Sequence, residues 1–192
     1  MLNRILVIAV LVGAAASLFR FGGLALFTDT ASVGSNTFTT GTVDLTTSPT
    51  TALVTFSNMA PGDTTTQSLV VNNAGTLAYR YAISSTATNT DAKGLKDQLV
   101  LTIKTIDVTT PATPCDNFDG TQLYTGDTDS TAGKLVGDNT SGAQAGDRNL
   151  SASASETLCF RVNLPTATGN AFQNATTTVT FTFDAEQTAN NP

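Results

Sequence analysis

The sequence predicts an all-β protein, folded as an antiparallel two-sheet sandwich or jelly roll. Thr occupies 37 of the 192 positions, and this β-branched residue favours pleated strands over helices. Apolar and polar residues alternate in several segments, which is the side-chain period of a strand with one solvated face. Turn-forming residues separate these segments at spacings typical of sandwiches.

The strands are expected where alternation is clearest, with turns at Pro61-Gly62-Asp63 and at Asn73 to Thr76. Short helical turns are expected at 91–98 and 170–174. The predicted strands cover residues 37–47, with a bulge at Gly41, then 52–57, 67–72, 77–84, 99–104, 158–164 and 179–185.

Residues 111–155 form a loop-rich insertion of Gly, Asp, Ser, Thr and Ala, with strand-like residues only at 122–124 and 135–136. Cys115 and Cys159 are the only cysteines. An even number in an exported chain predicts one disulfide, which would pin the insertion and stabilise the fold by roughly 4 kcal/mol. The alternative is a metal site with two Cys ligands, but no His is present to complete a zinc shell.

The first 25 residues have the pattern of a secretory signal. Arg4 precedes the apolar run 5–16, and small residues lead to a cleavage site between Ala25 and Leu26. We therefore expect a secreted, extracellular protein of one domain, residues 26–192, that meets the membrane only before cleavage. The alternative is a retained anchor, but residues 5–19 would span about 22 Å as a helix, less than the roughly 30 Å hydrocarbon core.

Charge and residue types argue against two classes of function. The net charge is −6, and removal of Arg4 and Arg20 with the signal leaves −8, so nucleic acid is not an expected partner. Without His, the common catalytic bases and zinc-protease motifs are missing. Glu156 and Glu186, the only glutamates, are expected at solvated strand edges or outer faces. We predict no catalytic residue, no enzyme activity and no required cofactor.

One cluster of carboxylates could bind Ca²⁺, a cation that prefers hard oxygen ligands. The cluster consists of Asp116, Asp119, Asp127 and Asp129, interspersed with Gly residues that permit tight turns. Asp side chains also cap the backbone of their own turns. The sequence leaves both interpretations open.

Three segments resemble the TasA/camelysin family of exported surface and matrix proteins. Residues 27–45 are similar to the family's F-x-D and N-x-F-x-x-G-x-L/V-D-L patterns. Residues 56–77 resemble its L-x-N-M/L-x-P-G-D and V-x-N-x-G-T/S-L block, and residues 172–187 its closing strand. The middle of the chain, 90–155, and its cysteine pair have little counterpart in that pattern.

The resemblance implies a jelly-roll subunit, freed by a SipW-type signal peptidase, that polymerises head to tail with copies of itself into extracellular fibres of the biofilm-matrix type. In that family the mature N-terminal strand pairs with the next subunit, which is β-augmentation. The positions here that correspond to the donor strand and its anchors are Phe27, Thr28, Asp29, Thr30, Phe38, Val43 and Leu45. A mobile tail on a monomer is the alternative.

Two other functions remain open at this point. The same resemblance includes camelysin, a cell-surface metalloendopeptidase, for which the absence of His is an obstacle. A jelly roll can also bind carbohydrate, which requires exposed aromatic side chains. Tyr79 and Tyr81 lie on an alternating face and are expected in the core instead.

Overall fold

The computed structural model describes residues 37–53, 55–129 and 133–191. The chain divides into two compact units, Met1–Thr39 and Thr40–Pro192. Except where Phe38 is named, the description below concerns the second unit. The predicted signal and cleavage site lie outside the described residues.

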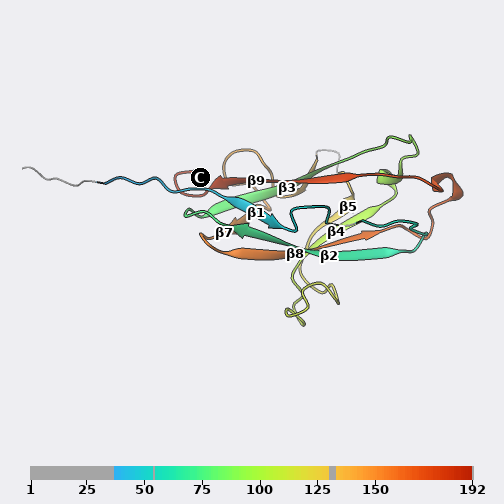
Figure 1. Ribbon diagram of the computed structural model, residues 1–192, viewed down its shortest axis with the longest axis horizontal. Coiled ribbons are helices and arrows are strands. Elements are labelled where there is room, and N and C mark those ends of the chain that lie inside the picture. Colours follow the sequence, from blue (N-terminus) through green and yellow to red (C-terminus); the bar gives the residue numbers. More distant parts are fainter. Residues whose placement is uncertain (1–36, 54, 130–132, 192) are drawn as a thin grey trace, which may run out of the picture. The chain divides into compact units, whose positions relative to one another are not determined.

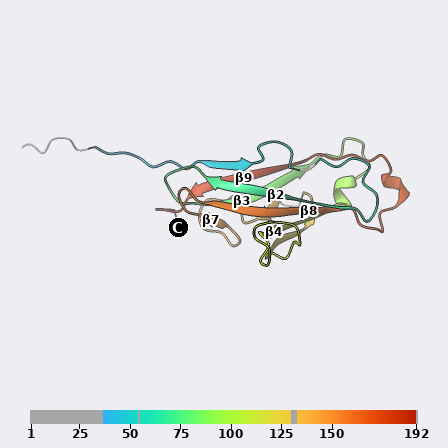
Figure 2. The ribbon, with the colours of Figure 1, turned by 60° about the horizontal axis from the view of Figure 1, so that its bottom comes forward.

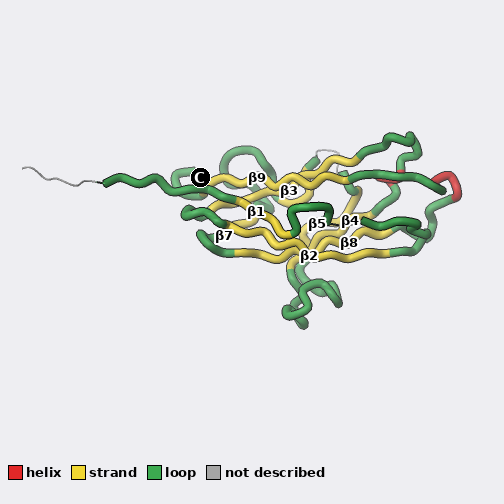
Figure 3. Tube along the Cα trace, viewed as in Figure 1, coloured by secondary structure: helices red, strands yellow, loops and turns green. Residues whose placement is uncertain are grey.

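The second unit is built almost entirely of strands, as Figure 3 shows. Two short 3₁₀ helices, Leu95–Asp97 and Asn170–Phe172, fall inside the segments where helical turns were predicted. The strands are β1 (Leu45–Ser48), β2 (Thr64–Asn73), β3 (Tyr79–Ala87), β4 (Val100–Thr105), β5 (Gln122–Asp127), β6 (Lys134–Val136), β7 (Arg148–Leu150), β8 (Ser155–Asn163) and β9 (Val179–Gln187).

The strands form two antiparallel sheets, which confirms the predicted all-β class. One sheet has the order β1-β2-β8-β4-β5, and β8 lies at its centre. In the other sheet β3 pairs with β9 along its whole length on one side, and with the short strands β6 and β7 on the other. Figure 1 shows the β3–β9 pair apart from the β2–β8 pair, and Figure 2 shows the same strands from a view turned by 60°, in which the two pairs overlap. The jelly-roll connectivity stays a prediction.

The core lies between the inner faces of the two sheets. Tyr79 and Tyr81 of β3 are buried, with ring centroids 6.2 Å apart in an edge-on arrangement. This confirms their predicted place in the core and leaves neither ring free to stack on a sugar. The other buried members of the cluster are Leu69, Val71, Ile83, Leu101, Ile103, Leu135, Val136, Leu150, Leu158 and Phe160.

A polar contact joins the two sheets near one end of the core. The Tyr81 hydroxyl donates to Oε2 of Glu156 at 2.8 Å, and the Arg148 guanidinium forms an ion pair with the same carboxylate. Only 18% of the Glu156 side chain is exposed. The expectation of a solvated Glu156 was therefore wrong, because an arginine and a tyrosine from β7 and β3 compensate its charge inside the sandwich.

Three strand predictions differ from the structure. Only the end of the first predicted strand, 37–47, is paired, as β1. No strand includes the described residues of 52–57, since they find no neighbour to pair with. β7 was missed because three residues are too few to show alternation. The 111–155 insertion therefore carries β7 in addition to β5 and β6, which lie where strand-like residues were predicted.

All three tyrosines of the chain should ionise only at pH values above the usual pKa of tyrosine. Burial is the main cause in each case: it raises the pKa of Tyr79 to about 12, with Asp44 and Glu156 adding, and raises the pKa values of Tyr81 and Tyr124. An unfolded chain ionises tyrosine near pH 10. The Tyr79 shift therefore leaves stability intact below about pH 10 and removes about 1.4 kcal/mol per pH unit between about pH 10 and its folded-state pKa of about 12.

We thus expect tyrosinate absorbance to appear together with loss of the far-ultraviolet β signal in an alkaline titration. The unfolded protein in denaturant is the control and should titrate near pH 10. Ionisation near that pH while the circular dichroism stays native would contradict the buried placement.

Candidate functional site

The sandwich is closed along one side and open along the other. On the closed side, β5 of the first sheet lies against β6 of the second. On the open side, β1 pairs with only the last four residues of β2, Val70 to Asn73. Within the described residues, Thr64 to Leu69 of β2 have no strand on that side, and β9 pairs with β3 alone. Two strand edges are therefore unpaired, and such edges are templates for a further strand.

A groove of about 840 Å³ opens between the sheets on this side. Apolar residues form more than half of its lining, and none of the described residues in that lining has an ionisable side chain. Such a surface can bury apolar side chains of a ligand, but it offers no acid or base for chemistry. The apolar side chains of the lining are Ala52, Leu53, Phe56, Met59, Pro61, Leu95, Leu99, Leu101, Phe160, Val162, Leu164, Phe172, Ala175, Val179 and Phe181.

The inner face of β9 is less covered than the strand beside it. Val179, Phe181 and Phe183 are only half-buried, whereas Tyr79 and Tyr81 of β3 are buried almost completely. Phe181 meets Phe160 of β8 across the sandwich, with ring centroids 5.1 Å apart. The core thus thins toward β9, and apolar surface remains there for another chain to cover.

One buried polar atom in this groove has no partner. The hydroxyl of Thr168 is the only buried side-chain oxygen or nitrogen, among the described residues, that makes no hydrogen bond. Thr168 is 9% exposed and lines the groove. An unsatisfied buried hydroxyl is destabilising, and a main-chain group brought by a ligand would satisfy it.

The structure describes three of the seven predicted assembly residues. Phe38 is 95% exposed. Val43 is also exposed, and Leu45 begins β1, opposite Asn73 of the same chain, where it packs on the core. The remaining four, Phe27, Thr28, Asp29 and Thr30, lie outside the described residues. Leu45 is thus already used within its own subunit.

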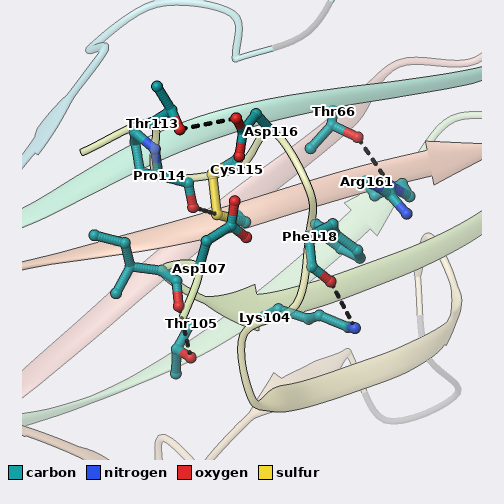
Figure 4. The surroundings of a disulfide bond; sticks show 12 residues. Thr66, Lys104, Thr105, Asp107, Thr113, Pro114, Cys115, Asp116, Phe118 and Arg161 are labelled. Atoms are coloured by element: carbon teal, nitrogen blue, oxygen red, sulfur yellow. Dashed lines mark hydrogen bonds between the residues drawn. A yellow bond between two sulfur atoms is a disulfide. The ribbon is translucent and has the colours of Figure 1, made fainter. Parts of the chain in front are cut away.

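The predicted disulfide is present and fixes a loop to the first sheet. Cys115 is bonded to Cys159, a buried residue of β8, with their Cα atoms 5.5 Å apart. The loop is residues 106–121, between β4 and β5. Figure 4 shows it folded against the strands, with Phe118 beside Arg161 and Lys104. The Arg161 guanidinium lies 3.7 Å from the Phe118 ring centroid, a cation–π contact.

The carboxylates of this loop accept hydrogen bonds from the loop itself. Both oxygens of the buried Asp107 accept main-chain N–H groups, from Asn117 and Asp119. The hydroxyls of Thr110 and Thr113 donate to Asp116 and lower its pKa. The hydroxyl of Thr109 does the same for Asp119, with the N–H groups of Val108 and Thr109 adding.

The four residues predicted as calcium ligands are therefore engaged in different places. Asp129 pairs with Lys96 rather than with the loop, and Asp127 ends β5. In the described part of the chain, no three His, Cys, Asp or Glu side chains come together as a metal site would require. Calcium binding stays a prediction, which a calcium titration of the melting temperature tests.

Comparison with known proteins identifies the family. The sequence profile of the camelysin metallo-endopeptidases matches residues 2–191. The chain belongs to the camelysin family. No curated protein sequence matches this camelysin-family chain. Among the described residues, no helix is long and apolar enough to cross a membrane.

The family name implies a metal, so the residues of this camelysin-family protein can be tested for one. The chain has no His, and both cysteines are bonded to each other. Asp107, Asp116 and Asp119 accept hydrogen bonds from main-chain N–H groups or hydroxyls, and Asp129 pairs with a lysine. The described residues therefore do not fit a catalytic metal, for which three protein ligands and an open position are usual.

The double substitution Cys115→Ala/Cys159→Ala should lower the unfolding free energy by roughly 3–4 kcal/mol, since the loop it closes is long. The strand registers do not involve the sulfur atoms, so the β signal should remain. Denaturant unfolding measures the loss. Val108→Ala, an exposed position on the same loop, is the matched control and should stay within about 0.5 kcal/mol. A loss below about 1 kcal/mol would mean that the hydrogen bonds alone hold the loop.

Proposed function

We propose that this camelysin-family protein is a secreted, non-enzymatic structural subunit that assembles head to tail into extracellular fibres. A SipW-type peptidase would cut between Ala25 and Leu26, and the freed segment 27–39 of one subunit would enter the groove of the next. The partner is thus another copy of the same chain. Nucleic acid is not an expected partner of so acidic a protein.

The observation that carries this proposal is the groove between two unpaired strand edges. The free edges of β2 and β9 can hydrogen-bond to an added strand, while the apolar lining accepts its inward side chains. Phe38 is 95% exposed, an unusual position for a phenylalanine that has no partner. A contact between a terminus of one copy and the groove of another does not close on itself, so it produces a filament.

The alternative function is a cell-surface metallo-endopeptidase, and the family name favours it. A strand edge beside a groove could also hold an extended substrate. However, catalysis needs a base or metal close to that substrate, and the lining supplies no ionisable side chain. Incubation of the pure protein with casein, with and without chelator, distinguishes the two functions: chelator-sensitive hydrolysis would overturn the structural proposal.

Deletion of residues 27–36 should leave a folded monomer that no longer forms fibres. The deleted segment lies outside Thr40–Pro192, the unit that holds every strand described, so the β signal and melting temperature should change little. Negative-stain microscopy and sedimentation of the chain from residue 26, with and without the deletion, measure assembly. Fibres from the deleted protein would contradict strand donation.

A second variant keeps the length of the donor segment. Thr28→Pro/Thr30→Pro removes two main-chain donors that point to the same edge of a strand, so it should block assembly. Thr28→Ser/Thr30→Ser is the matched control and should still assemble. Equal fibre yields from the two variants would show that main-chain pairing of this segment is not what joins the subunits.

A further inference from the structure

The groove is bordered by a segment that connects β1 to β2, and we call it the covering segment (residues 49–53 and 55–61). It contributes Leu53, Phe56 and Met59 to the same lining that holds Phe160 and Phe181. In Figure 1 it continues from the end of β1 along the open side, before the chain turns back into β2. It therefore lies where a strand paired with β2 would lie.

The covering segment is held weakly. No hydrogen bond is made by its described residues between 50 and 59, and its ends are fixed at Pro49 and Ala60. Only Leu53 and Met59 are half-buried in that stretch, while Phe56 is 47% exposed. Regions with few buried contacts and few hydrogen bonds open at low free energy.

The sequence of the covering segment is nevertheless that of a strand. Leu53, Thr55 and Phe56 favour extended structure, which is why the sequence predicts a strand at 52–57. The adjacent edge of β2, Thr64 to Leu69, is unpaired in the described structure. A strand-forming segment thus lies beside an unused strand edge without bonding to it, so its contacts with the groove are apolar only.

We propose that the covering segment occupies the place beside the unpaired edge of β2 in the free subunit and must move aside when the N-terminal strand of another subunit pairs there. This inference rests on the proposed function, since it concerns the same groove. The segment and the incoming strand compete for one strand edge, so the fraction of subunits with the segment displaced sets the rate of fibre growth. Weak attachment lets growth proceed, while some attachment keeps free subunits from exposing the edge of β2.

The first experiment measures the position of the segment. The chain has no free thiol, so Leu53→Cys in the protein from residue 26 introduces a single reactive group. We expect its alkylation to be slow in the monomer and about tenfold or more faster in fibres, because displacement removes the side chain from the groove. Equal alkylation rates in monomer and fibre would overturn the proposal.

The second experiment measures the consequence for assembly. Leu53→Ser removes the apolar anchor and should speed fibre elongation about tenfold, which corresponds to roughly 1.4 kcal/mol of weaker closure. Val108→Ser, exposed and distant from the groove lining, is the matched control and should elongate at the original rate. Slower or unchanged elongation of Leu53→Ser would show that the segment is a fixed wall of the acceptor.

The deletion of residues 27–36 separates this inference from the proposed function. If that deletion stops assembly while Leu53→Ser leaves the elongation rate unchanged, strand donation is supported and the proposed displacement of the covering segment is wrong. If the deleted protein still forms fibres, strand donation is wrong and the inference, which depends on it, is overturned as well.

Discussion

Strand β8 is the element on which the rest of the structure depends. It pairs with β2 on one side and with β4 on the other, so its backbone is hydrogen-bonded along both edges. Its inner residues Leu158 and Phe160 are buried against the second sheet. Cys159, on its outer face, forms the disulfide, and Glu156 is the second residue of the strand. Core, disulfide loop and inter-sheet ion pair therefore share one support, and Phe160 extends that support into the groove.

The two sides of the sandwich differ in whether the edge strands of the two sheets are covered. On one side β5 of the first sheet lies against β6 of the second, so these two strands close the sandwich. On the other side, β1 is too short to cover β2, and β9 ends the second sheet. Natural sheets usually protect such edges with charges, proline or a covering loop. Here a weakly attached loop does so, which is compatible with the proposed use of this edge in assembly.

Strong alternation made much of the fold predictable. β3, β4, β8 and β9 each have an inner and an outer face, so their periodicity is visible in the sequence. The disulfide followed from the number of cysteines. Glu156 could not be placed, since Tyr81, which bonds to it, is 75 residues away, and Arg148 lies on the short strand β7, which the sequence did not reveal. Segment 52–57 has a strand-like sequence, but pairing depends on a neighbour that the sequence of one chain does not reveal.

The groove was beyond sequence reasoning for a related reason. Its walls combine strand residues with residues of irregular segments, and these segments show no periodicity. Thr168, the buried hydroxyl without a partner, is one of 37 threonines and has no local feature that distinguishes it. The predicted calcium ligands show a different error, in which residues close in sequence were expected to form one cluster. In the fold, Asp116 and Asp119 lie in the disulfide loop, Asp127 ends β5, and Asp129 pairs with Lys96.

The family name and the groove can be reconciled by separating binding from chemistry. A peptidase holds its substrate as an extended chain, often beside a strand edge, and a strand acceptor does the same. The two differ in what lies next to the bound chain. A peptidase needs a group that activates a nucleophile, whereas an acceptor needs only main-chain partners and apolar pockets. In this protein the groove offers two free edges, a threonine hydroxyl without a partner, and walls of Phe, Leu, Val and Met. Among the described residues its lining holds no ionisable side chain, so what the groove offers a bound chain is main-chain pairing and apolar contact, which are the two interactions that the proposed fibre would use.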